Sequence, residues 1–227
     1  MIRYSKIEDK FPREFILLQG QGCRWGRCTF CDYYSDTSDN PYEVNRLVLE
    51  QVTGEFGVLD VINSGSAMEL DARSLALLKK IVKAKQIHTL WFEAHYMYRH
   101  QLERFAAQFE GVKVKFRCGI ESFSAELRRV WNKGVGEEVS AQDVAKYFDG
   151  VCLLCCTEAD SKERILADIA TAKQLFEYCS VNVFCNNTTS VCRDEELAGW
   201  FAIEVYPMIK DDAKIEVLLE NSDLGVG

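Results

Sequence analysis

Short β-rich segments alternate with longer helical segments along almost the whole chain, and this alternation constrains the fold more than any other feature. Apolar and β-branched runs predict strands at 14–20, 58–64, 88–94, 112–120, 150–156 and 180–186, with a final strand or edge segment at 214–220. Helical patterns fill the intervals, at roughly 41–55, 71–85, 98–109, 123–132, 140–148, 160–178 and 193–208. A strand about every 30 residues, each followed by a helix, is typical of βαβ units with right-handed crossovers, which make the sheet parallel.

Six such units and a final segment are too few for a closed eight-stranded barrel. We therefore predict an α/β fold, an incomplete (βα)6 TIM-like barrel with parallel strands, with an open doubly wound sheet as the alternative. The 227 residues contain no linker rich in Pro, Gly or Ser, so a single domain over 1–227 is expected.

Charge and apolar content exclude several classes of protein. The net charge of −8 argues against a polyanion-binding face, so direct nucleic-acid binding is not expected. The N-terminus "MIRYSKIEDKFPREF" is too charged for an export signal, and no apolar run is long enough to span a membrane. Ten cysteines without such a signal indicate free thiols in a reducing cytoplasm, in a protein that works at low oxygen.

Three cysteines follow the first predicted strand, in the stretch "GCRWGRCTFCD". In either fold, ligands bind at the carboxyl ends of the strands, where this loop lies. The cysteines could be buried thiols, but their density in a glycine-containing loop argues against that. A structural zinc site needs a fourth ligand, yet the next cysteine is Cys118 and the first histidine is His88. A plant-type ferredoxin shares the local C-x4-C-x2-C spacing, but the strand–helix repeat does not suit a small electron carrier.

In the fourth interpretation, the absence of a fourth protein ligand is itself functional, because it leaves a coordination position open. The loop resembles that of the radical SAM superfamily, whose usual motif is C-x3-C-x2-C with an aromatic residue before the last cysteine, the place of Phe30 here. One extra residue separates the first two cysteines. The resemblance implies that Cys23, Cys28 and Cys31 hold a catalytic 4Fe–4S cluster whose open iron binds S-adenosylmethionine (SAM). It further implies reductive cleavage of SAM to a 5′-deoxyadenosyl radical, with electrons from a flavodoxin- or ferredoxin-type reductant.

The same resemblance extends to the ends of later strands. The turn "NSGSAMEL" is similar to the one that receives the SAM amino group, with Ser64, Gly65, Ser66 and, less specifically, Glu69 as candidates. The segment "CGIESFSAELRRVWNKGV" implies that Glu121 and Ser122 contact the ribose and that Arg128 pairs with the SAM carboxylate. The alternative for this segment is a helix N-cap at Ser122 or Ser124, with Arg128 and Arg129 in solvent. Backbone contacts to adenine are implied for 154–157.

Polar and aromatic residues near two further strand ends suggest a pocket for a flat heterocycle with a donor and acceptor edge. The candidates are Glu93, His95, Tyr96, Asn182, Phe184, Asn186 and Asn187. Each has an alternative: a satisfied rim carboxylate, a surface-loop histidine, or a turn after the strand. The later cysteines Cys152, Cys155, Cys156, Cys179, Cys185 and Cys192 are expected to be mostly buried thiols, with an auxiliary cluster as the alternative.

The chain has little beyond the core of the superfamily, so we expect a small-molecule substrate. Overall it resembles the compact queuine lyases, which release the cyclopentenediol part of queuine and leave 7-aminomethyl-7-deazaguanine for queuosine-tRNA salvage. The alternatives are a glycyl-radical-activating enzyme, which acts on a partner protein, and an iron–sulfur electron-transfer or binding protein that does not use SAM.

Overall fold

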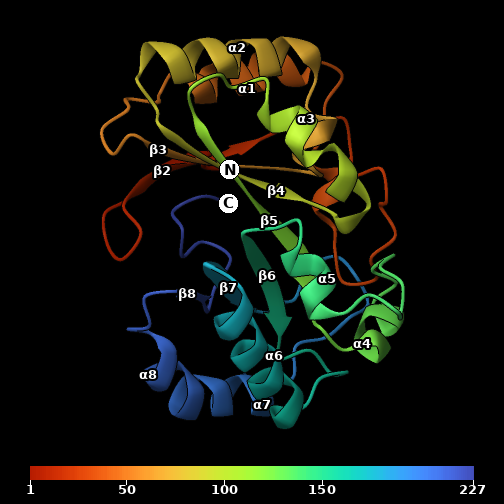
Figure 1. Cartoon of the computed structure of the whole chain (residues 1–227). Helices are drawn as coiled ribbons and strands as arrows, with labels where there is room; N and C mark the ends of the chain where they lie inside the picture. Colours follow the sequence, from red (N-terminus) through yellow and green to blue (C-terminus); the bar gives the residue numbers. More distant parts are fainter. The chain divides into compact units, whose positions relative to one another are not determined.

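The computed structural model describes all 227 residues and places eight strands in one sheet, in the order in which they occur along the chain (Figure 1). The strands are β1 (Tyr4–Ile7), β2 (Arg13–Leu18), β3 (Val58–Asn63), β4 (Thr89–Ala94), β5 (Lys113–Glu121), β6 (Gly150–Cys155), β7 (Tyr178–Val183) and β8 (Ile215–Leu218). Strands β2, β3 and β4 pair in parallel, and so do β5, β6, β7 and β8. Strand β1 pairs antiparallel with β2.

Helices connect the parallel strands. The α-helices are α1 (Pro41–Leu49), α2 (Ala72–Ala84), α3 (Leu102–Ala106), α4 (Ala125–Val130), α5 (Ala141–Ala145), α6 (Lys162–Leu175), α7 (Glu195–Trp200) and α8 (Tyr206–Ile209). Three short 3₁₀ helices occur at Tyr33–Ser35, Ala67–Glu69 and Tyr96–Gln101, and the π-helical turn Phe201–Val205 joins α7 to α8.

The alternation read from the sequence is confirmed, and the fold class is that of an incomplete (βα)6 TIM-like barrel with parallel strands. The helix predicted at 41–55 ends at Leu49, and the helix predicted at 98–109 is a 3₁₀ helix to Gln101 followed by α3. Two further differences concern strands. The hairpin strand β1 was not expected, because four residues are too few to show a pattern. The sixth predicted strand, 180–186, lies at 178–183 instead, so Phe184 and Asn186 follow the strand.

The chain forms two compact units. Unit 1 comprises 1–26, 33–116 and 224–227, and unit 2 comprises 27–32 and 117–223. Strand β5 belongs to both, since 113–116 fall in the first and 117–121 in the second. The single domain over 1–227 stays a prediction, and the two units are described separately below.

Unit 1 is built on β2, whose six residues are all buried, as expected for a strand covered on both faces. Helices α1 and α2 lie side by side, with α1 against β2 (Figure 1). Asp71 caps α2 by accepting hydrogen bonds from the amides of Arg73 and Ser74. Phe92 of β4 packs against Phe105 of α3, with ring centroids 5.2 Å apart. This contact defines the helix-covered face of β4.

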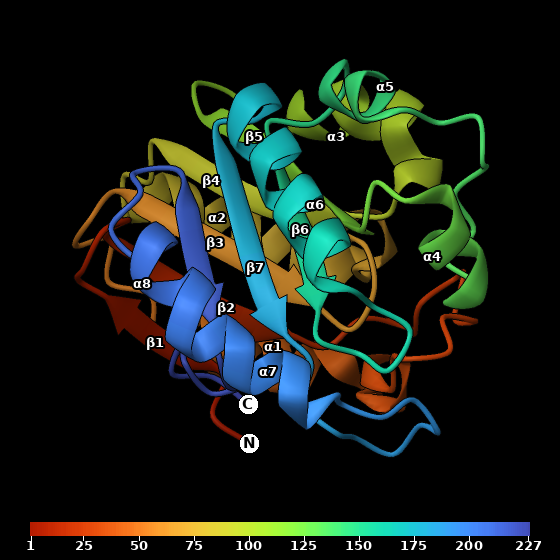
Figure 2. The ribbon, with the colours of Figure 1, turned by 90° about the horizontal axis from the view of Figure 1, so that it is seen from below.

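In unit 2, α6 packs along β6 and β7 (Figure 2). It begins at Ser161, whose hydroxyl accepts a hydrogen bond from the Arg164 amide. A second group of buried side chains, Phe30, Leu127, Trp131 and Phe184, lies at the carboxyl ends of the strands of this unit. No helix of the structure is long and apolar enough to cross a membrane.

Candidate active site

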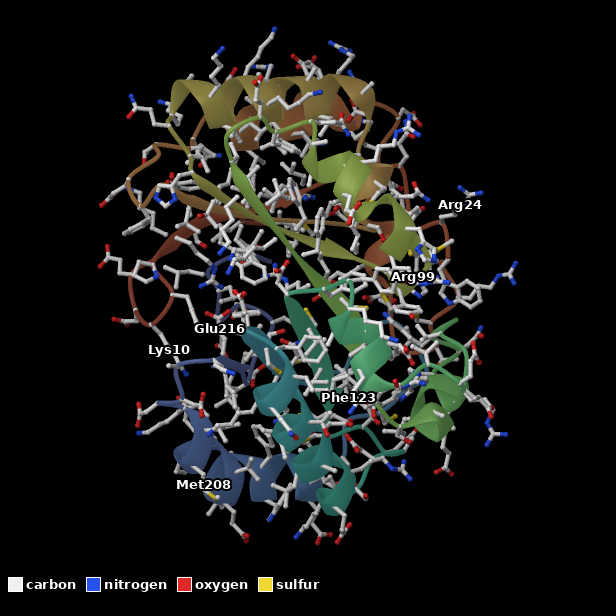
Figure 3. All side chains as sticks on the ribbon, viewed as in Figure 1. Lys10, Arg24, Arg99, Phe123, Met208 and Glu216 are labelled. Carbon is white, nitrogen blue, oxygen red and sulfur yellow. The ribbon has the colours of Figure 1, made fainter.

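The first half of the three-cysteine loop, residues 19–26, follows β2 in unit 1. The Gly20 amide donates to the Ser64 hydroxyl at 2.8 Å, which fixes the start of the loop. Cys23 is partly buried, and its sulfur accepts a hydrogen bond from the Gly26 amide at 3.3 Å. Gly26 has φ +54°, and a Cβ there would lie 2.9 Å from the Cys23 carbonyl oxygen, so glycine is required. Figure 3 shows the Arg24 side chain at the outer edge of this unit.

The turn after β3 contains the three residues predicted to receive the SAM amino group. Ser64 and Ser66 are both buried, and the Ser66 hydroxyl accepts the His95 amide at 3.0 Å. A Cβ on Gly65 would overlap Glu69 Oε2 and would lie 3.2 Å from Cys23 Cα, so this turn packs directly against the loop. Asn63 Oδ1 is buried without a hydrogen-bond partner, which leaves an acceptor at the same turn. The sequence analysis did not single out Asn63.

Glu69 was a further candidate for the SAM amino group, but its carboxylate is used within the chain. Oε2 accepts the Ser66 amide at 2.7 Å. Oε1 accepts the Arg24 amide at 3.1 Å and the Tyr98 hydroxyl at 2.7 Å. With these three donors satisfied, Glu69 organises the turn and the loop.

The third strand end in unit 1 carries Glu93, His95 and Tyr96. Glu93 faces the side of β4 opposite Phe92, away from α3, as the pocket prediction requires. His95 is buried, so it is not the surface-loop residue of the alternative interpretation. Its Nδ1 accepts the Met97 amide at 3.1 Å, which places the ring proton of a neutral imidazole on Nε2. The Trp25 ring stacks on the imidazole, with centroids 6.0 Å apart and 21° between the planes.

The second half of the loop, residues 27–32, belongs to unit 2 and is held by backbone contacts from two segments. The Thr29 amide donates to the Trp131 carbonyl at 3.0 Å, just after α4. From the segment after β7, Asn187 Nδ2 donates to the Phe30 carbonyl at 2.8 Å. The Phe30 ring meets Trp131 edge-on, with centroids 5.7 Å apart. Cys28 and Cys31 pack against this apolar group, which shields both sulfurs on one side.

A buried ion pair closes the carboxyl end of β5. Glu121 has a left-handed backbone, with φ +66°, next to an irregularity in the β5–β6 pairing. Lys133 Nζ lies 2.8 Å from Glu121 Oε1, and both side chains are about one-tenth exposed. Burial by itself lowers the pKa of Lys133, but the adjacent Glu121 carboxylate outweighs burial and raises the pKa above its ordinary value. The sequence analysis missed Lys133, because a lysine after a helix is usually solvated.

Two serines of this segment have roles within the chain. The Ser122 hydroxyl is buried, donating to Asp168 Oδ2 at 2.5 Å and accepting the Ser124 amide, so it is committed within the chain. Ser124 is the N-cap of α4, as the alternative interpretation held.

Arg128 corrects both interpretations. It is buried instead of solvated, and burial lowers its pKa. Its terminal nitrogens donate to four backbone carbonyls at 2.8–3.3 Å, those of Ser122, Phe123, Gly136 and Val139. All four terminal N–H groups are committed to these carbonyls, and the one remaining donor, Nε, is buried without a partner. The guanidinium instead ties α4 to the loop that follows it.

The ends of β6 and β7 carry the remaining predicted contacts. Asn182 lies in β7, half-buried, with Nδ2 3.4 Å from the Ser180 hydroxyl. Asn186 Oδ1 accepts the Arg193 amide at 2.8 Å, so this residue organises the turn after the strand, as the alternative held. In the segment 154–157, the Thr157 hydroxyl is buried without a partner.

The later cysteines form no disulfides. Cys118, Cys152, Cys155, Cys156 and Cys179 are buried, Cys185 is partly buried and Cys192 is exposed. Burial and the neighbouring Cys156 raise the pKa of the Cys155 thiol well above its ordinary value, which keeps it protonated and unreactive.

Comparison with known proteins assigns the family. No family model matches the sequence, and neither does any curated protein. Among solved structures, the chain is similar to a queuine lyase from Clostridium spiroforme bound to SAM and queuine. The TM-score is 0.95 and the sequence identity 36%, and the match covers 100% of this chain and 99% of the other.

The order of the strands and the three-cysteine loop after β2 define the class, a radical SAM fold. The full-length match narrows it. The chain belongs to the queuine lyase family of the radical SAM superfamily. This membership favours the three-ligand cluster over the zinc, ferredoxin and buried-thiol interpretations of the loop.

The loop has the donor chemistry that an iron–sulfur cluster requires. No group of three or more His, Cys, Asp or Glu side chains that could hold a metal ion is formed in the structure, so the fit rests on the nature of the donors. Cys23, Cys28 and Cys31 form no disulfide and are partly buried, unlike the five buried thiols of the core. An amide donates to the Cys23 sulfur, and apolar side chains pack against the other two. Hydrogen bonds to sulfur and limited solvent are the factors that tune such clusters.

Proposed function

We propose that this chain is a radical SAM queuine lyase that releases 7-aminomethyl-7-deazaguanine from queuine for salvage into tRNA. The observation that carries the proposal is the full-length match, at 36% identity, to a queuine lyase bound to SAM and queuine. The cysteine loop supports it independently, because three thiols and no fourth ligand nearby suit a cluster that shares one iron with SAM. A cytoplasmic location and a flavodoxin- or ferredoxin-type electron donor belong to the same proposal.

Cys23, Cys28 and Cys31 would hold the 4Fe–4S cluster, which, when bound, supplies the electron for reductive cleavage of SAM. The chain's own task is to orient SAM and keep water away from it. In unit 1, the turn Ser64–Gly65–Ser66 offers the main-chain carbonyls of Ser64 and Gly65 to the SAM ammonium. The two serine hydroxyls already accept amides of the chain, and the Ser66 carbonyl accepts the Glu69 amide.

In unit 2, Glu121 is the residue we assign to the SAM ribose. Lys133 holds Oε1, which leaves Oε2 to accept a ribose hydroxyl. The left-handed backbone at Glu121 is a sparsely populated conformation, and such conformations cluster at functional sites. Phe30 lines the loop between Cys28 and Cys31 and keeps that side of it apolar.

The substrate contacts that we propose in unit 1 are Glu93, His95 and Tyr96. An imidazole protonated on Nε2 is a donor and a carboxylate is an acceptor, a combination that matches the donor and acceptor edge of a 7-deazapurine. In unit 2, we propose that the half-buried amide of Asn182 contacts the substrate.

The test is turnover of queuine by the reconstituted protein under anaerobic conditions, with SAM and dithionite. We expect 7-aminomethyl-7-deazaguanine to form together with 5′-deoxyadenosine, and Cys28→Ala to abolish both. Glu93→Gln should slow queuine consumption while SAM still binds. Glu103, which is exposed on α3, provides the control, and Glu103→Gln should change neither queuine consumption nor SAM binding. Formation of 5′-deoxyadenosine with queuine left intact would refute the substrate assignment.

A further inference from the structure

We propose that Glu69 is a positioning residue for the cluster ligand Cys23, and that Tyr98 holds the Glu69 carboxylate in place for this task. The need to fix Cys23 rests on the proposed function, since a thiolate that moves cannot keep a cluster in register with SAM. The geometric part of the proposal stands on contacts within unit 1.

Glu69 joins three segments that follow three successive strands. Its Oε2 accepts the Ser66 amide of the turn after β3, at 2.7 Å. Its Oε1 accepts the Arg24 amide of the loop after β2, at 3.1 Å, one residue beyond Cys23. The same Oε1 accepts the Tyr98 hydroxyl from the segment after β4, at 2.7 Å. Hydrogen bonds to an ionised acceptor are the strong ones, so one carboxylate sets the spacing of all three segments.

The backbone around Cys23 leaves it little freedom to move away from this carboxylate. At Gly65, a Cβ would lie 3.2 Å from both Cys23 Cα and the Gly22 carbonyl oxygen, which shows how closely the turn and loop approach. Beyond Cys23, the Gly26 amide donates to the sulfur at 3.3 Å. The Arg24 amide therefore anchors the peptide on one side of Cys23, and the close packing at Gly65 limits it on the other.

Tyr98 is suited to hold Glu69 over the whole working range of pH. Its side chain is buried, and burial together with the Glu69 hydrogen bond raises its pKa to about 12. The phenol thus stays a donor at neutral pH. Without it, Oε1 would keep only the longer bond to Arg24.

Unit 1 contains a matched control for this arrangement. The Tyr4 hydroxyl donates to Glu14 Oε1 at 2.8 Å, and Glu14 also accepts the amides of Thr53 and Gly54. This is the same combination of phenol, carboxylate and backbone amides, but it ties the start of β2 to the end of the α1 connection. Tyr4→Phe and Tyr98→Phe each remove one phenol–carboxylate bond, and only the second touches the cysteine loop.

The experiment measures iodoacetamide alkylation of the metal-free, reduced full chain at fixed pH, with each thiol quantified by peptide mass spectrometry. Cys28 and Cys31, held by contacts within unit 2, serve as internal references. We expect Tyr98→Phe to speed alkylation of Cys23 about threefold to tenfold over these references, the change that corresponds to one lost hydrogen bond. Glu69→Gln should give a larger change at the same thiol, because an amide cannot accept both backbone N–H groups.

Tyr4→Phe should leave all three rates unchanged. Equal acceleration of the three thiols in Tyr98→Phe would mean general loosening and would overturn the proposal, as would an unchanged Cys23 rate. If Glu69→Gln does not fold, Tyr98→Phe alone decides the matter, since it leaves every backbone contact of Glu69 in place. The assay uses no iron, SAM or queuine, so its outcome is independent of whether the chain proves to be a queuine lyase.

Discussion

Replacing Lys133 with Met tests whether the ion pair at the end of β5 is as buried as the structure indicates. The Lys133 and Glu121 side chains are 9% and 11% exposed, with Nζ and Oε1 2.8 Å apart. Removing one partner of a buried pair leaves an uncompensated charge and costs about 3–5 kcal/mol. For a chain of this size each kcal/mol lowers the melting temperature by about 2–4 °C, so the expected loss is roughly 6–20 °C.

The assay is calorimetric melting of the metal-free chain at pH 7. The double variant Lys133→Met/Glu121→Gln should recover most of the loss, because it leaves no buried charge. Lys146→Met is the matched control. Its partner Asp143 lies at a similar distance, 2.7 Å, but the two side chains are 65% and 36% exposed, and we expect no measurable change in melting temperature. A Lys133→Met chain that melts within about 2 °C of the parent, less than a 1 kcal/mol loss produces, would refute the reasoning.

Three further predictions concern Gly65, Arg128 and Asp160, a partly buried carboxyl group whose Oδ2 accepts the Cys156 amide. Gly65→Ala adds a methyl group against Glu69 Oε2 and the Cys23 backbone and should lower the free energy of unfolding in urea by about 1–3 kcal/mol; Gly199→Ala, with open space around it, should not destabilise. Arg128→Lys keeps the charge, but an ammonium group cannot donate to all four carbonyls, so the free energy of unfolding should fall by about 2–3 kcal/mol. The KM for SAM should be unchanged. A raised KM at unchanged stability would argue instead that Arg128 pairs with the SAM carboxylate. Burial raises the pKa of Asp160 from 3.8 to about 6, so the folded chain holds more protons than the unfolded chain between these values and stability falls as pH rises through that window. Asp160→Asn should remove this dependence of stability on pH, which amounts to roughly 2–3 kcal/mol across the window. The measurement is urea unfolding from pH 4 to 6, and a slope unchanged in the variant would contradict the assignment.

The sequence was sufficient to predict the repeating strand–helix pattern and the features that depend on residues close together in the chain. The strand–helix alternation predicted the fold class, because burial on both faces makes parallel strands nearly continuous apolar runs. The cysteine spacing predicted the loop as a ligand site, and Phe30, which stands where the motif has an aromatic residue, is buried beside it. The cap at Ser124 was also readable, since it depends on residues three positions apart.

Contacts between residues far apart in the chain were beyond such reading. Arg128 looked solvated or free for a ligand, and only the fold shows that carbonyls from two segments surround it. Lys133 and Glu121 are twelve residues apart with a helix between them, so nothing in the sequence pairs them. Asn187 reaches the Phe30 carbonyl across 157 positions. The candidates Asn186 and Ser122 were placed near the right strand ends, but the structure commits their polar groups to the chain itself.

The most direct test of the account is the EPR spectrum of the anaerobically reconstituted, dithionite-reduced chain, recorded before and after addition of SAM, with iron counted on the same sample. Three thiols and no fourth protein ligand predict about four irons per chain and a spectrum that shifts when SAM reaches the open iron. A sample that binds zinc instead of iron, or a cluster whose spectrum does not respond to SAM, would contradict the account.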